Sequence, residues 1–220
     1  MMPSEVTVTV QNQTWYLLPE KAVYWKEQKT LIAADLHLGK AGHFRKSGIA
    51  APAAINRKNI ERLEQLIHAT NPETLLILGD LFHSDANREW LEFEEWLSGM
   101  IGLRTELVSG NHDTLHASFY DSAGIRVHET LQREGFFFVH EPGAVKPKRE
   151  ASITVAGHIH PGVSIRGKGR QSLRFPCFLF SEERILLPAF GEFTGLFTIK
   201  PEEHEDVYAV VEGSVVELRG

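Results

Sequence analysis

The chain of 220 residues contains a single cysteine, and no apolar run approaches the roughly 20 residues needed to span a bilayer. One cysteine excludes an internal disulfide and fits the reducing cytoplasm, and Cys177 itself lies in an apolar stretch typical of buried packing. The N-terminal residues also lack a basic start followed by an apolar stretch, so we expect no secretory signal. The sequence therefore predicts a cytoplasmic protein with no membrane partner.

Positive charge is outweighed by negative charge, and the formal net charge of −6 argues against indiscriminate nucleic-acid binding. Acidic residues are nevertheless missing between Ala151 and Ser181, and they concentrate at 89–95 and 202–206. The basic residues of the acid-free stretch are Arg166, Lys168, Arg170 and Arg174. This asymmetry permits a local positive surface on an acidic protein.

Internal repeats, low-complexity tracts and linkers are also lacking, so residues 1–220 are predicted to form one domain with a sizeable core. Apolar runs of strand length alternate with helical periodicity in the first half, whereas the second half is strand-rich. We predict an α/β fold of two packed sheets with helices outside. Expected strands are 6–10, 15–18, 30–34, 74–78, 104–108, 125–127, 135–139, 152–156, 173–180, 184–187 and 207–211. Expected helices are 52–69, 87–100 and 114–120, and expected loops are 39–51, 141–150, 162–171 and 188–195.

Five separated fragments rich in His, Asp and Asn are the most informative feature of the chain, and most of them follow an apolar run. Few structures other than a dinuclear metal centre need so many of these side chains at strand ends. Ligand-binding residues outside the carboxyl ends of strands are expected in an open α/β sheet. The fragments are Asp35-Leu36-His37, Gly79-Asp80, Gly110-Asn111-His112-Asp113, Val139-His140 and Gly157-His158-Ile159-His160.

The spacing within these fragments suggests how they would meet metal ions. Asp35 and His37 are two residues apart, so both would point to the same side if the preceding strand continued past Asp35. His158 and His160 repeat this spacing. The two oxygens of Asp80 could bridge two cations held roughly 3.5–4 Å apart. Taken alone, however, the spacing of Asp35 and His37 is weak evidence, because Asp35 could equally be a surface or turn-capping residue.

The third and fourth fragments carry further ligands and a candidate acid. Asn111 offers a neutral amide oxygen, although a Gly-Asn pair is also typical of a tight turn. His112 cannot easily share the same ion and could instead face the substrate and protonate a leaving oxygen. Asp113 could orient His112 or cap a helix that starts near Thr114, and both roles stay open. His140 ends an aromatic run, where a lone His is more typical of the core.

Together the fragments resemble the calcineurin-like metallophosphoesterase superfamily, whose pattern is D-x-H, G-D, G-N-H-D, H and G-H-x-H. Every element is present here without substitution. The resemblance implies two packed mixed β-sheets flanked by helices, an αβ-βα sandwich, with His112 as the catalytic His. It implies Asp35, His37 and His160 as ligands of one ion, Asn111, His140 and His158 as ligands of the other, and Asp80 as the bridge.

Residues 34–49 and 187–195 resemble a narrower branch, the DNA-ligase-associated (PdeM-like) phosphoesterases of bacterial DNA repair. This implies a manganese-dependent phosphodiesterase, and possible endonuclease, linked to a DNA ligase and a helicase. Leu196 departs from the branch, where a second Gly is expected. The mixed imidazole, carboxylate and amide ligands also suit iron or zinc. His83 is similar to a DNA-handling His of double-strand-break repair nucleases, and its alternative role is a loop His or hydrogen-bond partner.

Basic residues follow three of the fragments and suggest a polyanionic substrate. Each group alone is typical of a solvated loop, but together they favour a phosphate-backbone track for DNA, with single strands preferred. The candidate substrate-binding residues are Lys40, Arg45, Lys146, Arg166 and Arg170. Two alternatives remain: a phosphatase or small nucleotide diester hydrolase, and a non-catalytic scaffold of the same fold.

Overall fold

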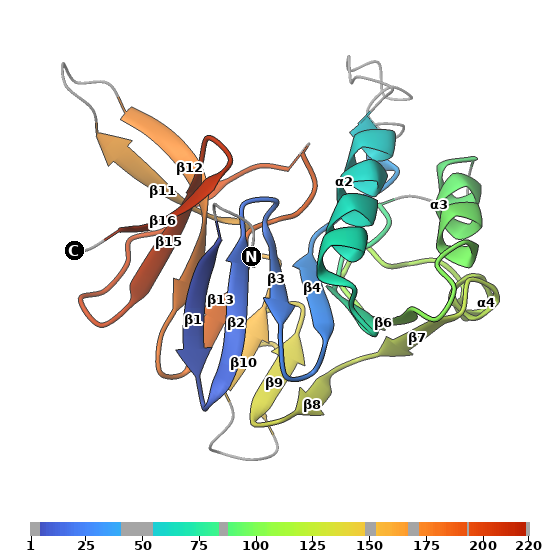
Figure 1. Cartoon of the computed structure of the whole chain (residues 1–220), viewed down its shortest axis with the longest axis horizontal. Helices are drawn as coiled ribbons and strands as arrows, with labels where there is room; N and C mark the ends of the chain where they lie inside the picture. The colour runs from blue at the N-terminus through green and yellow to red at the C-terminus, as the bar shows by residue number, and fades with distance from the viewer. Residues whose placement is uncertain are drawn as a thin grey trace.

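In the computed structural model, which describes residues 5–40, 55–83, 88–147, 153–166, 172–192 and 194–218, two β-sheets pack face to face (Figure 1). The first sheet has the strand order β1-β2-β3-β4-β5-β6-β7. Pairing is antiparallel from β1 to β4 and parallel from β4 to β7. Its strands are β1 (Val6–Val10), β2 (Gln13–Leu18), β3 (Ala22–Trp25), β4 (Thr30–Ala34), β5 (Thr74–Leu78), β6 (Arg104–Val108) and β7 (Ile125–His128).

The second sheet has the order β14-β11-β12-β13-β10-β9-β8, and β15 and β16 extend it from β12. Strands β9, β10 and β13 are parallel, whereas β12 pairs antiparallel with β11, β13 and β15. Both sheets are therefore mixed. The strands are β8 (Leu131–Arg133), β9 (Phe136–Val139), β10 (Ile153–Ala156), β11 (Pro161–Arg166), β12 (Ser172–Phe180), β13 (Arg184–Leu186), β14 (Phe197–Thr198), β15 (Asp206–Val211) and β16 (Ser214–Leu218).

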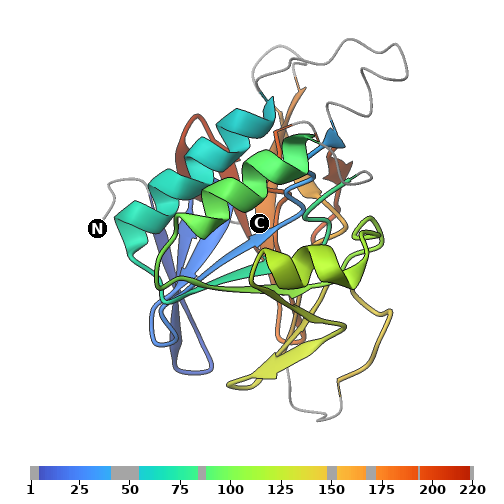
Figure 2. The same cartoon turned by 90° about the vertical axis from the view of Figure 1, so that its right-hand side faces the viewer.

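Three helices of the described part lie against the outer face of the first sheet (Figure 2). Strand residues Leu31 and Leu75 contact this helical layer, to which the helices contribute buried residues such as Leu63 and Trp90. The helices are amphipathic, and burying their apolar sides supplies most of their stability. They are α2 (Ile55–Thr70), α3 (Arg88–Ser98) and α4 (Ala117–Ser122). None of the helices in the described part is long and apolar enough to cross a membrane.

The opposite face of the first sheet packs on the second sheet and forms the central core. Alternate side chains of β4 divide between the layers, because successive residues of a strand point to opposite faces. Ile32 therefore contributes to the central core, whereas its neighbour Leu31 contacts the helices. Trp15 lies across the sheet interface, with its ring centroid 4.8 Å from that of Phe136 and 5.5 Å from that of Trp25. All three aromatic side chains are fully buried.

The predicted fold class, two packed mixed sheets with helices, is confirmed, but some elements differ from the sequence prediction. Residues 162–171 were expected to form a loop, yet β11 covers Pro161–Arg166 and pairs with β12. Its first residues, Pro161 and Gly162, are typical of turns, and only pairing with β12 makes the segment a strand. Short strands β3, β8, β14 and β16 were not predicted. Helix α4 begins at Ala117 rather than 114, and residues 52–54 of the predicted first helix lie outside the described part.

We expect Phe136→Ala to lower the free energy of unfolding by about 3–5 kcal/mol, because it leaves a cavity between the two sheets. Urea denaturation followed by tryptophan fluorescence measures the change. Phe197→Ala is the matched control, since Phe197 is 64% exposed and should change stability by less than about 0.5 kcal/mol. Equal effects of the two substitutions would contradict the assignment of Phe136 to the core.

Candidate metal centre

Parallel pairing in register aligns the ends of the strands that precede the five fragments. Ala34, Leu78 and Val108 pair across β4, β5 and β6, so these three strands end in one row of the first sheet. Val139 and Ala156 pair in the same way at the ends of β9 and β10 in the second sheet. Side chains of the following residues therefore gather at one edge of the sandwich, as expected for the carboxyl ends of parallel strands.

Two groups of side chains at this edge could each hold a metal ion. One group is Asp35, His37 and His160, and the other is Asp80, His140 and His158; within each group the ligand atoms lie within 4.8 Å of one another. Each group draws on both sheets, because the carboxylates come from the first sheet and His140, His158 and His160 from the second. The structure thus brings together all of the charged or imidazole ligands predicted from the sequence.

Asp80, a member of the second group, also faces the first group. Its Oδ2 is 3.6 Å from His37 Nε2, and its Oδ1 is 3.4 Å from His140 Nε2. Asn111 is exposed, and its Oδ1 is 3.0 Å from His140 Nε2, which places the amide oxygen with the second group. Asp80 thus directs one oxygen toward a histidine of each group, and Asn111 lies with the second group.

Backbone carbonyls determine which ring nitrogens face the centre. His140 Nδ1 lies 3.1 Å from Leu78 O, and His160 Nδ1 lies 3.2 Å from Gly195 O. A nitrogen that donates to a carbonyl leaves the other nitrogen of a neutral imidazole as an acceptor. The Nε2 atoms of His140 and His160 therefore act as acceptors. Sequence reasoning missed these two carbonyls, because a backbone oxygen leaves no signature in residue type.

Several acceptors thus face one another, and the donors to the two carboxylates are backbone N–H groups, of His112 to Asp80 Oδ1 and of His158 to Asp35. His140 Nε2 faces Asn111 Oδ1 and Asp80 Oδ1, and His160 Nε2 is 3.3 Å from Asp35 Oδ1. Converging acceptors repel one another unless a cation lies among them, so the donor set fits divalent metal ions. Burial and, to a smaller extent, nearby Lys40 lower the pKa of His37 to about 2. His37 is therefore neutral at physiological pH, the form that binds metal.

The backbone at the ligands differs from the extended chain that the spacing suggested. Strands β4 and β10 end at Ala34 and Ala156, and left-handed φ angles follow at Asp35 (54°), His37 (47°), His158 (63°) and His160 (51°). Asp80 has a φ of 51° as well. Non-glycine residues seldom adopt this conformation, which costs of the order of 1 kcal/mol or more each. The chain therefore turns at these residues, and packing and hydrogen bonds hold each side chain toward the centre.

Glycine is required beside one ligand because the chains approach very closely. Gly79 has a φ of 72°, and a Cβ at this position would lie 2.1 Å from His140 Nδ1. Any side chain at residue 79 would therefore displace His140 from the second group.

Two further histidines lie next to the first group. The ring centroid of His112 is 5.6 Å from that of His37 and 4.1 Å from that of His83. The backbone N–H of His112 donates to Asp80 Oδ1 at 3.0 Å, which fixes His112 relative to the centre. His112 and His83 are both partly exposed. The structure thus places both predicted histidines beside the ligands, at the solvent side.

Asp113 binds backbone N–H groups and does not cap helix α4. Its Oδ1 accepts hydrogen bonds from the backbone N–H groups of Leu81 and Phe82, and its Oδ2 accepts one from Gly110. His116, not Asp113, is the N-cap of α4. Asp113 therefore ties the loop after β6 to the loop after β5 and orients His112 only through the backbone. Burial raises the pKa of Asp113 to about 6, although these hydrogen bonds oppose the shift.

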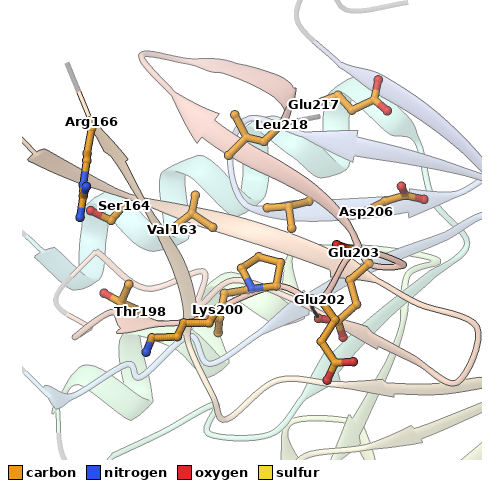
Figure 3. A pocket seen from close by; sticks show the side chains of 14 residues that line it. Val163, Ser164, Arg166, Thr198, Lys200, Glu202, Glu203, Asp206, Glu217 and Leu218 are labelled. Atoms are coloured by element: carbon orange, nitrogen blue, oxygen red, sulfur yellow. Dashed lines mark hydrogen bonds between the residues drawn. The ribbon is translucent and has the colours of Figure 1, made fainter. Parts of the chain in front are cut away.

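Only one of the predicted substrate-binding residues in the described part lies near the ligands. Lys40 N donates to His37 O at 3.3 Å, and burial lowers the pKa of the Lys40 side chain, against the attraction of Asp80 and Asp35. Lys146 is on an exposed loop. Arg166 lines a cavity of about 930 Å³ together with β15, β16 and residues 198–203, and this lining includes no candidate ligand (Figure 3). Arg45 and Arg170 lie outside the described residues.

The fold and the site define a class of protein, in which two adjacent ligand groups lie at the edge of two packed mixed sheets. The family model for calcineurin-like phosphoesterases matches residues 28–179, a range that contains every candidate ligand. The chain belongs to this family and is therefore a metal-dependent hydrolase that acts on phosphoester bonds.

The chain is also similar to solved structures, and the first of them supports this assignment. The nuclease MPE of Pseudomonas putida is 33% identical, with a TM-score of 0.81 and coverage of 97% of this chain and 100% of that chain. Yfce, a phosphoesterase from E. coli, is 14% identical with a TM-score of 0.46, and covers 86% of this chain and 97% of its own. No curated protein matches the sequence.

We expect the metal-stripped protein to take up about two divalent ions per chain, one for each ligand group. His160→Ala and His140→Ala remove a ligand from different groups, so each variant should retain about one ion. Elemental analysis after gel filtration measures the stoichiometry. His204→Ala is the control, because its side chain is 64% exposed and lies outside both groups. Loss of both ions from either single variant would argue against two separable sites.

Proposed function

We propose that this protein is a dinuclear-metal phosphodiesterase, a DNA endonuclease or phosphoesterase that serves bacterial DNA repair. The observation that carries the proposal is the pair of adjacent ligand groups with Asp80 facing both and His112 alongside. The likeness to a nuclease at 33% identity over nearly the whole chain supports the nuclease activity. The segments that resemble the DNA-ligase-associated branch, residues 34–49 and 187–195, support the DNA-repair role.

We propose that the ligands divide between the two ions as the family resemblance implies. Asp35, His37 and His160 would hold one ion, Asn111, His140 and His158 would hold the other, and Asp80 would bridge them. When bound, the ions lower the pKa of a coordinated water and neutralise charge on the phosphate oxygens. Oxygen and nitrogen donors without thiolate suit manganese, iron or zinc, and we propose manganese.

His112 is the residue that we propose for proton transfer. It lies beside the ligands and is partly exposed, so its ring is accessible to a substrate at the centre. It would donate a proton to the departing oxygen, which stabilises the leaving alkoxide. His83, whose ring is 4.1 Å from that of His112 between centroids, would contact the substrate on the same side.

We expect His112→Ala to cut turnover of a diester with a poor leaving group by about 10²–10⁴-fold, while both metal ions stay bound. The ions stay because His112 belongs to neither ligand group. Turnover and metal content are measured on the same preparation, with His68→Ala, an exposed residue of α2, as control. Activity close to wild type would refute the role of His112.

DNA is the substrate that we propose, with single strands preferred. Lys40, whose backbone N–H donates to the carbonyl of the candidate ligand His37, is the described basic residue that we propose attracts a phosphate. Cleavage should therefore weaken as salt rises, by at least about tenfold between roughly 50 and 200 mM. A DNA ligase and a helicase remain predicted partners.

A metal-dependent assay tests this substrate assignment by comparing single-stranded DNA, duplex DNA, RNA and a nucleotide monoester over a salt series. Cleavage of DNA that falls with salt would support the proposal. If oligonucleotides stayed intact while a small nucleotide diester or monoester was hydrolysed, the protein would be a small-molecule phosphoesterase. Absence of turnover on every substrate would favour the scaffold alternative.

A further inference from the structure

The chain that follows β13 joins the two sheets at the metal centre. Leu187 N donates to Ala156 O at the end of β10, and Phe190 N donates to Ala34 O at the end of β4, at 2.9 and 2.8 Å. Gly191 N donates to Asp35 O at 3.1 Å. Residues 189–195, named here the crossing segment, thus bind the backbone of a metal ligand directly. The segment is described except for residue 193.

Gly195, at the far end of the crossing segment, contacts His160, which belongs to the same ligand group as Asp35. Gly195 O accepts the hydrogen bond from His160 Nδ1 that leaves His160 Nε2 facing Asp35. Thr194 Oγ1 donates to Gly191 O at 3.0 Å, which links this end of the segment to its beginning. Asp35 and His160, two of the three residues of the first ligand group, therefore both depend on the position of the crossing segment.

Contact between the crossing segment and the loop after β4 is very close. A Cβ at Gly191 would lie 2.6 Å from Leu36 O and 3.2 Å from Asp35 O. The crossing segment therefore cannot move closer to this loop. Side chains that contact the segment on its opposite side determine whether it can move away.

Arg62, on α2, holds the crossing segment from that other side. Its guanidinium donates to Phe190 O, forms an ion pair with Glu192 at 3.2 Å, and lies 4.2 Å above the centroid of the Phe190 ring. Asn59 Oδ1 accepts from both Arg62 Nη2 and Glu192 N. The Arg62 side chain is only 17% exposed, so its charge relies on these partners. Residues 190 and 192 of the segment are thereby fixed to the helix layer.

Lys21, a partly buried amine, also contacts the crossing segment. Lys21 Nζ donates to Gly191 O at 3.1 Å. Burial, followed by the nearby charge of Arg62, lowers the pKa of Lys21 to about 7, whereas Glu192 opposes this shift. Lys21 therefore binds the segment at residue 191, between residues 190 and 192, which Arg62 contacts.

We propose that Arg62 is a positioning residue for the first metal site, the group of Asp35, His37 and His160. It contacts no ligand itself and acts through the crossing segment, which holds the backbone of Asp35 and the ring of His160. A planar guanidinium can donate to a carbonyl, pair with a carboxylate and lie over a ring at the same time, and an ammonium cannot. The proposal rests on the metal centre of the proposed function but not on DNA as the substrate.

Arg62→Met is the main test, because Met keeps the apolar stem and removes the guanidinium. We expect it to weaken manganese binding at one of the two sites by about 10–100-fold and to leave the other unchanged. Titration calorimetry gives the two affinities, and electron paramagnetic resonance distinguishes a coupled pair of Mn²⁺ ions from an isolated ion. Arg62→Lys should behave like Arg62→Met, and Arg57→Met, on the exposed side of the same helix, should bind like wild type.

Two further variants identify the affected site and keep the proposal testable if Arg62→Met does not fold. In a His160→Ala background, which lacks a ligand of the first site, Arg62→Met should cause no further loss of manganese affinity. Glu192→Gln keeps Arg62 in place and should weaken the same site less strongly, which tests the segment if Arg62→Met fails to fold. Equal weakening of both sites, or full retention of both in folded Arg62→Met or Glu192→Gln, would overturn the proposal. A wild-type protein that binds no manganese would overturn the metal centre itself.

Discussion

The metal centre depends on one constraint, which is that neither ligand group is complete within a single sheet. Asp35, His37 and Asp80 follow strands of the first sheet, whereas His140, His158 and His160 follow strands of the second. The two sheets must therefore pack at a fixed distance and register before either group can form. The aromatic residues at their interface, with Trp15 against Phe136, supply that packing, so core burial and metal binding are linked.

Parallel pairing gives the centre its location. The strands β4, β5 and β6 end in one row, and β9 and β10 end in another, because parallel neighbours in register finish together. Each ligand then lies within a few residues of a fully buried strand end. This arrangement places polar, solvent-accessible chemistry on a rigid support, which is the usual position of sites in α/β folds.

A layer of backbone interactions completes the centre behind the ligands. Carbonyls of Leu78 and Gly195 orient two imidazoles, and the backbone turns through left-handed conformations at five of the seven candidate ligands. Such conformations are unfavourable in isolation, so the surrounding structure must maintain them. The crossing segment, Arg62 and Asp113 contribute to this support although none of them belongs to a ligand group.

Much of this could be predicted from the sequence because the informative signals are local. Fully apolar runs such as residues 30–34 and 74–78 predict buried strands, and the residue types after them are those that metals require. Residue type and position along the chain were therefore enough to identify the seven ligand candidates together with His112. Segments without a local signal could not be identified in this way: β11 begins with turn-forming residues, and β14 has only two residues, so both depend on pairing with a distant neighbour.

The sequence by itself thus determined the ligand types, the strands that carry them and the two-sheet architecture. Only the tertiary structure decided that Asp113 binds three backbone amides rather than His112, and that Arg166 lines a cavity separate from the ligands. It also decided that Arg62, whose residue type on a helix suggests a solvated charge, is held against the crossing segment. The physical reason is that residue type and spacing report local conformation, whereas hydrogen bonds between distant segments depend on how the sheets and helices pack.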